Sequence, residues 1–273
     1  MSAERAAPPS GWSRLSVVSD FIRHTLVVAE ADVRKLRHDP AELVTRMIQP
    51  ALWLLIFGQV LARTRAVPTG SMSYLDFISP GILAQSVLFI SIFYGISLIW
   101  ERDLGIVHKF LVSPASRLSL VLGRALSSGV RASSQAVAIY VLAFLLGVRL
   151  RLDAVAIAGV FGNIMLGSAI FSTFSLIVAC VVKTRERFMG IGQVLTMPLF
   201  FASNAIYPLS LMPPWLQAVS SANPLSYQVD ALRTFMIQGG QSVFGLGTDF
   251  AVQAFALVAV LAVATRIYPT IVR

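Results

Sequence analysis

The sequence predicts an all-α membrane protein that crosses the bilayer several times. Of its 273 residues, 56% are hydrophobic and only 13% are charged, and the mean hydropathy is +0.75. Soluble domains carry about 25% charged residues, so a water-soluble protein of this length would lack the charges to cover its surface. The long apolar runs predict six transmembrane helices, since each crossing takes about 20 residues. The composition therefore argues against a soluble enzyme and against a disordered chain.

Six apolar segments are predicted to cross the membrane. The helix of the first is expected to begin near Asp39, which can cap it, because Pro40 suits the first helical position. Pro50 is expected to kink this helix where it enters the bilayer. The breaker Ser79-Pro80-Gly81 is expected to precede the second span, and Pro198 lies within the fifth. The predicted spans are residues 47–62, 82–100, the last part of 117–148, a part of 155–182, 188–207 and 250–264.

The basic residues indicate which side of the membrane each terminus faces. Six spans place both termini on one side, and 17 of the 22 lysines and arginines fall on that side. Basic residues concentrate in cytoplasmic segments of membrane proteins, so both termini are predicted to be cytoplasmic, with the chain in the cell membrane. This bias accounts for an isoelectric point near 10.4 without nucleic-acid binding. The amino-terminal residues lack the apolar segment of a cleaved signal peptide.

Residues 14–38 have the sequence pattern of an amphipathic helix. Apolar residues recur at steps of three and four, and charges occupy the other face. Five charges between residues 30 and 37 exclude a membrane span. We expect an amphipathic helix along the inner membrane surface, and an ordinary charged flank of the first span is the alternative. The apolar positions are Leu15, Val18, Ile22, Leu26, Ala29, Val33 and Leu36.

The connection at 101–117, between the second and third spans, is predicted to be cytoplasmic. It begins with alternating charges, contains Gly105 and ends with Ser113-Pro114. It also carries an apolar patch that a purely soluble connector would not need. We interpret the segment as a short helix that docks on a partner, and the alternative is a loop whose patch packs on the protein's own helices. The patch residues are Ile106, Val107, Phe110, Leu111 and Val112.

Three arginines in the next helix, Arg117, Arg124 and Arg131, repeat every seven residues. Seven residues fall about 20° short of two full helical turns, so the three lie on nearly one stripe. Anchoring to anionic lipid at the inner surface is the simpler interpretation. A basic lining for an inner vestibule is the alternative.

Residues 208–248 separate the fifth and last spans and carry only two charges, Asp230 and Arg233. A solvated loop of 41 residues would not be this apolar. We therefore predict an extracellular re-entrant hairpin that dips into the outer leaflet or packs between helices, where broken backbone is tolerated. The two charges lie one helical turn apart, which predicts a mutual ion pair. A contact of one charge with cargo is the alternative.

Prolines and glycines divide this hairpin into two short helices. Pro213-Pro214 marks the start of one helix around Trp215. Asn223 can cap the second, with Pro224 at its first position, and Gly239-Gly240 can end it.

Sequence motifs of several enzyme classes are absent. No GxxxxGK[ST] occurs, so the chain lacks a phosphate-binding P-loop, and it also lacks HExxH, GxSxG and CxxC. The single cysteine, Cys180, cannot form a disulfide within the chain. No acidic residue is predicted at the middle of a span, where proton-coupled transporters usually need one. We therefore expect no catalytic residue, metal or cofactor in this chain and an energy source in a partner.

Two segments resemble the type-2 permeases of ATP-binding-cassette (ABC) exporters, the branch with daunorubicin-resistance-type drug efflux and polysaccharide or lipid export. The first is ERDLGIVHKFLVSPASRLSLVLGRAL at 101–126, with its acidic-basic-acidic start, glycine and later Ser-Pro. The second is PLFFASNAIYPLSLMPPWLQAVSSANPLSYQVDALR at 198–233, and it contains Ser203-Asn204, Pro208, Met212-Pro213, Trp215, Asn223-Pro224 and the DALR run. With the six-span layout, the likeness covers most of the chain.

The resemblance implies one permease domain over residues 1–273 that acts in membrane lipid as a homodimer or with a related chain. Separate ATP-binding subunits would hold ATP and magnesium and drive export of a hydrophobic or amphipathic cargo, such as a drug, a lipid or a lipid-linked glycan. The segment 101–117 would couple to the ATPase through Glu101, Arg102, Asp103, Gly105, Lys109, Phe110, Ser113 and Pro114. The hairpin would form the outer gate with Asn204, Pro208, Pro213, Trp215, Asn223, Pro224, Asp230 and Arg233.

Two functions from other classes are alternatives. One is an ion-coupled secondary carrier, which would transport without any ATPase subunit. The other is a membrane anchor or assembly factor that transports nothing.

Overall fold

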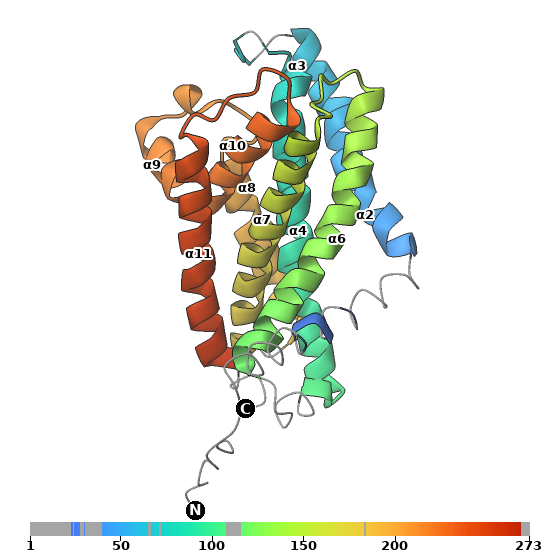
Figure 1. The fold of residues 1–273 in the computed structure, drawn as a ribbon, viewed down its shortest axis with the longest axis vertical. Helices are drawn as coiled ribbons and strands as arrows, with labels where there is room; N and C mark the ends of the chain where they lie inside the picture. Colours follow the sequence, from blue (N-terminus) through green and yellow to red (C-terminus); the bar gives the residue numbers. More distant parts are fainter. Residues whose placement is uncertain are drawn as a thin grey trace, which may run out of the picture.

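The computed structural model is an elongated bundle of helices that run roughly along one axis (Figure 1). It describes residues 23, 25–27, 30, 40–64, 67–70, 72–107, 116–182 and 184–268. Among these residues helices are the only regular elements, apart from one isolated β-bridge between Leu150 and Ile237. The predicted all-α class is confirmed. The amphipathic helix predicted at 14–38 falls almost wholly outside the described residues.

The first apolar segment forms a continuous helical run. α2 (Pro40–Leu52) passes into the π-helix η1 (Trp53–Gly58) and then into α3 (Gln59–Thr64). The start at Pro40 agrees with the predicted boundary. Pro50 lies inside α2 and has no N–H to donate. The π-helical turn follows shortly after it, and such local adjustments accommodate proline within transmembrane helices.

The long helix α4 (Tyr74–Asp103) begins well before the predicted second span. The expectation that Ser79-Pro80-Gly81 would break the chain ahead of that span is wrong. Ser73 caps the helix, its hydroxyl accepting a backbone N–H of the first turn at 3.0 Å. At Gly81 the backbone of α4 packs closely against the backbone of Ala205, since a Cβ at position 81 would lie 2.3 Å from the Ala205 carbonyl oxygen.

The next two helices are α6 (Arg117–Leu145) and α7 (Ala154–Val181). Ser116 caps α6 and Asp153 caps α7, and each side-chain oxygen accepts a backbone N–H three residues ahead. These caps satisfy N–H groups that the first turn of a helix leaves without partners.

The remainder of the chain contains one longer helix, the hairpin and the last helix. α8 (Arg185–Phe201) is followed by a 3-10 turn, η2 (Leu209–Leu211). Two short helices, α9 (Pro214–Ala222) and α10 (Pro224–Met236), then precede α11 (Leu246–Ile267). The starts at Pro214 and Pro224 confirm the helix boundaries predicted within the hairpin.

Five helical stretches of the described chain are long and apolar enough to cross a membrane. The fifth predicted span, 188–207, is not among them, because α8 has 17 residues and ends at Phe201. Residues 202–207 form turns beside α4, where the Tyr74 hydroxyl donates to the Ile206 carbonyl at 3.1 Å. The five stretches are Thr45–Thr64, Tyr74–Asp103, Arg117–Leu145, Ala154–Val181 and Leu246–Ile267.

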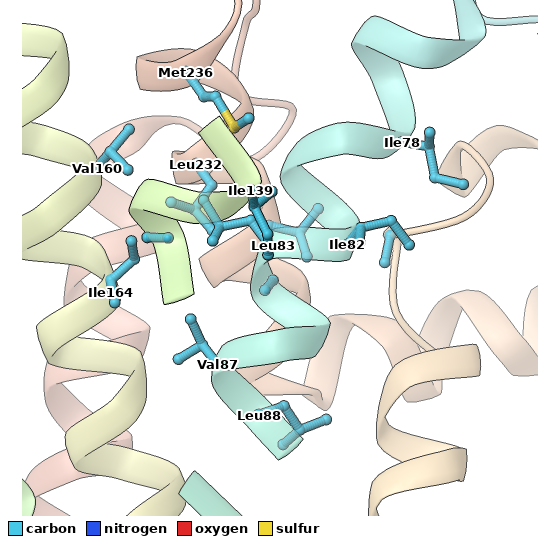
Figure 2. Close-up of a cluster of buried hydrophobic side chains, with 14 of the residues drawn as sticks. Ile78, Ile82, Leu83, Val87, Leu88, Ile139, Val160, Ile164, Leu232 and Met236 are labelled. Carbon is cyan, nitrogen blue, oxygen red and sulfur yellow. The ribbon is translucent and has the colours of Figure 1, made fainter. Parts of the chain in front are cut away.

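The main hydrophobic core surrounds α4, which is buried along most of its length. Figure 2 shows side chains of α4 meeting those of α6, α7 and α10 in this core. The labelled residues are Ile78, Ile82, Leu83, Val87 and Leu88 of α4, Ile139 of α6, Val160 and Ile164 of α7, and Leu232 and Met236 of α10.

The middle of the bundle also holds a buried cluster of uncharged hydroxyls. The Ser91 hydroxyl of α4 donates to Ser168 of α7 at 2.9 Å, and the hydroxyls of Ser128 and Ser168 are also 2.9 Å apart. Serine is small enough to let helix backbones approach each other closely, and its hydroxyl can then form a hydrogen bond between helices within a membrane. The cluster ties α4, α6 and α7 together without a buried charge.

The contact at Gly81 gives a test of the packing. We expect Gly81→Ala to lower the melting temperature of the purified protein in detergent, because the new methyl group meets rigid backbone and overpacking costs about 1–3 kcal/mol. Gly162→Ala in α7 is the matched control, since a Cβ there has no atom within 4 Å. Equal melting temperatures for the two variants would contradict the contact.

Candidate functional site at the two ends of the bundle

The described charged side chains concentrate at the two ends of the bundle. The Glu101 end comprises the end of α4, the start of α6 and the start of α8. The Asp230 end comprises the start of α4, the 146–153 connection, α10 and the segment 237–249. Figure 1 shows these groups of segments at opposite ends of the long axis.

At the Glu101 end, a buried ion pair joins α4 to α6. The carboxylate of Glu101 accepts a hydrogen bond from the guanidinium of Arg124, and both side chains are almost fully buried. Removing one partner of such a pair leaves an uncompensated buried charge. The pair therefore fixes the end of α4 against the second turn of α6.

The remaining charges of this end lie nearer the surface. Asp103 accepts from Arg185, the first residue of α8, at 2.8 Å and from its neighbour Arg102 at 2.9 Å. The Arg185 guanidinium also lies 3.4 Å from the centre of the Trp100 ring, a cation–π contact. These contacts connect the end of α4 to α8.

The chain leaves α4 through Gly105, whose φ of +71° is a left-handed conformation. Glycine adopts this conformation without the steric cost that a Cβ brings, and its N–H donates to the Arg102 carbonyl at 2.9 Å. Val107, in the predicted apolar patch, is fully buried in a second core cluster with residues such as Leu98 and Val121. For Val107, packing on the protein's own helices is therefore the observed arrangement.

Four of the predicted coupling residues are described and four are not. Glu101 points into the bundle, whereas Arg102 and Asp103 lie closer to the surface and Gly105 ends the helix. Lys109, Phe110, Ser113 and Pro114 lie outside the described residues.

The stripe of arginines does not form a uniform basic surface. Arg117 is exposed, Arg124 is buried against Glu101, and Arg131 is half-buried with its guanidinium 5.7 Å from the centre of the Tyr94 ring. Anchoring to lipid headgroups is therefore excluded for Arg124. The seven-residue spacing placed the three on one stripe, but the packing of α4 decides which of them is covered.

At the Asp230 end, a single carboxylate organises the segment that follows α10. Asp230 is fully buried, and its Oδ2 accepts from the backbone N–H groups of Val243 and Phe244 at 2.6 and 3.0 Å. The Ser242 hydroxyl contacts the same oxygen at 2.9 Å. Asp230 thereby fixes the turn that leads into α11.

The Ser242 hydroxyl contacts two carboxyl groups at once. It lies 2.9 Å from Asp230 Oδ2 and 2.7 Å from Asp249 Oδ2. Asp230 Oδ2 also accepts two backbone N–H groups, so the Ser242 hydroxyl links this carboxyl group to Asp249 in the first turn of α11.

Arg233 connects α10 to the segment that follows α8. Its guanidinium lies 3.6 Å from Asp230 Oδ1 and donates to the Asn204 carbonyl at 2.9 Å. It also lies 4.1 Å from the centre of the Phe77 ring of α4. The mutual ion pair predicted for Asp230 and Arg233 is present, and both residues are buried.

A second ion pair at this end joins the start of α4 to the connection after α6. Buried Asp76 accepts from the backbone N–H and the side chain of Arg149, at 3.0 Å in each case. The same connection pairs with the segment after α10, since Gln238 donates to the Arg149 carbonyl at 2.8 Å. The connection and α10 are thereby held together at this end.

One further acid of this end caps α7. The backbone N–H of Ala156 donates to Asp153 at 2.9 Å, and Arg151 lies 3.1 Å from the same carboxylate. Together these contacts hold the pKa of Asp153 below its usual value. Asp153 is therefore ionised at neutral pH and remains an acceptor.

The other predicted hairpin residues shape the chain or lie on its surface. Asn223 caps α10, accepting from the Leu225 N–H at 3.0 Å, and its amide donates to the Leu199 carbonyl of α8 at 2.7 Å. Pro208 and Pro213 precede η2 and α9, and Pro224 opens α10. The Trp215 side chain is 68% exposed. Packing within this chain therefore does not explain why a tryptophan stands at this position.

Comparison with known proteins identifies the family. Residues 23–237 match the ABC-2 type transporter family. The chain belongs to this family. Its five apolar helices and its family make it a multi-pass membrane protein.

Three relatives of this ABC-2 family member are transport permeases by name. The ycf38 protein of Cyanophora paradoxa is 31% identical over 78% of this chain and 74% of its own length. The daunorubicin resistance ABC transporter permease protein DrrB1 of Streptomyces coeruleorubidus is 28% identical over 98% of this chain and 96% of its own. DrrC of Mycobacterium tuberculosis, named for doxorubicin resistance, is 25% identical over 80% of this chain and 79% of its own.

Sequence reasoning about this ABC-2 chain missed several residues of both ends. Asp76 and Asp249 were not singled out, although each is an acid in the first turn of a mostly apolar helix. That position is a usable signal, because a buried acid in a membrane helix needs a partner. The pairing of Glu101 with Arg124 had no such signal, because 23 residues separate them.

The different contacts of Asp230 and Asp249 give a prediction. We expect Asp230→Asn to destabilise the purified protein by about 3–5 kcal/mol, because it leaves the buried Arg233 charge without its partner. Asp249→Asn should change the melting temperature little, since the amide keeps an oxygen that accepts from the Ser242 hydroxyl and no ion pair among the described residues is lost. Thermal unfolding in detergent measures both. Equal damage from the two substitutions would contradict this difference.

Proposed function

We propose that this chain is the transmembrane permease subunit of an ATP-driven exporter and moves a hydrophobic or amphipathic cargo out of the cytoplasm across the cell membrane. Membership of the ABC-2 family supports transport, and the names of DrrB1 and DrrC support drug-like cargo. The buried Glu101–Arg124 pair carries the proposal, because it gives the 101–117 connection a rigid link to two helices of the bundle.

In this proposal a separate ATP-binding subunit docks on the 101–117 connection and holds ATP and magnesium. Arg102, Asp103 and the residues Lys109, Phe110, Ser113 and Pro114 would supply the contact surface. Glu101 would act within the chain, transmitting displacement of the connection to α6 through Arg124. A conformational change follows only if ATP-bound and ATP-free partners bind the two states of the permease with different affinities.

The proposed topology places the Glu101 end and both termini in the cytoplasm. The sixth crossing would consist of α8, roughly 25 Å long at 1.5 Å per residue, together with the turns at 202–207. This length approaches the hydrocarbon thickness of about 30 Å. A second permease copy or a related chain would complete the path for cargo.

At the other end, α9 and α10 would form a re-entrant outer gate. The burial of α10 among α4, α7 and α11 supports this position, because irregular backbone at membrane depth must be covered by protein. The Asp230–Arg233 pair would then hold the gate closed rather than contact cargo.

Reconstituted vesicles test the function. We expect the chain to hydrolyse no ATP alone, to co-purify with a co-expressed ATP-binding subunit, and together with it to move daunorubicin in an ATP-dependent manner. Transport that needs no ATPase subunit but collapses with the proton gradient would instead indicate an ion-coupled carrier. Absence of flux for drugs and lipids alike would indicate an assembly factor.

The same vesicles test the ion pair in coupling. Glu101→Lys sets two cations against each other, so we expect at least a tenfold loss of transport per ATP hydrolysed while membrane insertion persists. The exchanged pair Glu101→Arg with Arg124→Glu restores opposite charges and should recover more than half of the coupling. If Glu101→Lys transports normally, or the exchanged pair recovers nothing, the pair does not transmit the movement.

A further inference from the structure

α8 packs on α4 and makes little contact with α7, the helix that precedes it in the chain. The Phe188 ring of α8 lies against Gly95 of α4, and the Thr196 hydroxyl bonds back to the Gly192 carbonyl of its own helix at 2.8 Å. Apolar contacts are non-directional, so the buried face of α8 holds it on α4 without a directional bond. That face is one stripe of residues spaced four apart: Phe188, Gly192, Thr196 and Phe200.

Arg185, the first residue of α8, supplies the directional contact with α4. Its guanidinium donates to Asp103 Oδ2 at 2.8 Å and lies 3.4 Å from the centre of the Trp100 ring. Asp103 and Trp100 are three residues apart and therefore neighbours on the surface of α4. Together they form what we call the Trp100–Asp103 socket, with one aromatic wall and one carboxylate wall. A planar guanidinium can stack and donate at the same time, which a lysine ammonium cannot do.

The socket lies where α4 passes into the 101–117 connection. Asp103 is the last residue of α4, and Gly105 turns the chain two residues later. A displacement of the connection would therefore move the socket together with the end of α4. Because Arg185 is seated in the socket, the start of α8 is bonded to the same point.

The other end of α8 is bonded to the hairpin. The Leu199 carbonyl accepts from the side-chain amide of Asn223 at 2.7 Å, and Asn223 caps α10. The neighbouring Phe200 ring meets Trp53 of η1 edge to face, with ring centres 5.9 Å apart. Packed side chains and hydrogen bonds of this kind carry energetic coupling between distant sites. α8 therefore links the socket at one end of the bundle to the start of α10 at the other.

We propose that Arg185 is a positioning residue that makes α8 follow the 101–117 connection, so that a displacement of the connection reaches Asn223 of the hairpin through α8. This route is separate from the Glu101–Arg124 link to α6. The inference rests on the proposed function, because it assigns Arg185 a part in ATP-driven export. The Arg185–Asp103 pair is partly exposed, and such pairs contribute little to folding stability. Coupling and stability can therefore be measured separately.

Transport per ATP hydrolysed tests Arg185, in vesicles that hold the chain with its co-expressed ATP-binding subunit and with daunorubicin as cargo. Arg185→Gln should lower this ratio at least fivefold, because the amide has no charge to pair with Asp103. Its melting temperature should not fall, since the helix dipole disfavours a cation at the start of a helix. Arg187→Gln is the matched control and should keep the ratio, because Arg187 is exposed and carries the same charge two residues further along α8.

Three results for Arg185→Gln would overturn the proposal. An unchanged ratio would show that α8 does not depend on the socket for coupling. A clear fall in melting temperature would make the role of Arg185 structural. A loss of co-purified ATP-binding subunit would place Arg185 on the surface that contacts the ATPase.

Variants of Trp100 test the aromatic wall of the socket. Trp100→Phe keeps an aromatic face for the guanidinium and should retain at least half of the transport per ATP. Trp100→Leu should lose as much as Arg185→Gln, and equal ratios for the two Trp100 variants would overturn the seating of Arg185. An original chain without ATP-dependent flux would defeat the proposed function. A chain that exports equally with and without Arg185→Gln would defeat this inference alone.

Discussion

Two ion pairs, each with a buried carboxylate, link α4 to α6 and to the connection after α6 at opposite ends of the bundle. Glu101 near the end of α4 pairs with Arg124 near the start of α6, and Asp76 at the start of α4 pairs with Arg149 just after α6. In an apolar environment a buried charge without its partner is costly. The first pair therefore fixes the end of α4 against α6, and the second holds the start of α4 to the connection that follows α6. Between the pairs, the uncharged cluster of Ser91, Ser128 and Ser168 continues the contact.

This arrangement explains how one element can connect the two ends of the molecule. α4 is a single helix between Tyr74 and Asp103, and its start also contacts Arg233 of the hairpin through Phe77. A rigid helix clamped at both ends moves as a unit with its neighbour. In the proposed exporter, a displacement at the Glu101 end would therefore reach the hairpin at the Asp230 end without an intermediate flexible joint.

The sequence predicted those features that depend on local chemistry. Composition predicted the helical membrane class, and Asn223 followed by Pro224 placed the start of α10 because capping and a fixed φ act within a few residues. Features that depend on distant contacts were not predictable. Ser79-Pro80-Gly81 has the composition of a break, but the contact of Gly81 with Ala205 makes it part of a helix. The burial of Arg124 likewise depends on Glu101, 23 residues away.

The central claim is that the bundle crosses a membrane with its Glu101 end in the cytoplasm. Single cysteines at Pro68 and Leu104, in a chain whose own Cys180 is replaced by alanine, test it with a membrane-impermeant maleimide. Pro68 and Leu104 are both exposed, and they lie before and after α4, whose two ends are at opposite ends of the bundle. In intact cells the account predicts labelling at position 68 and none at position 104 until the membrane is permeabilised. Labelling of position 104 in intact cells would contradict it.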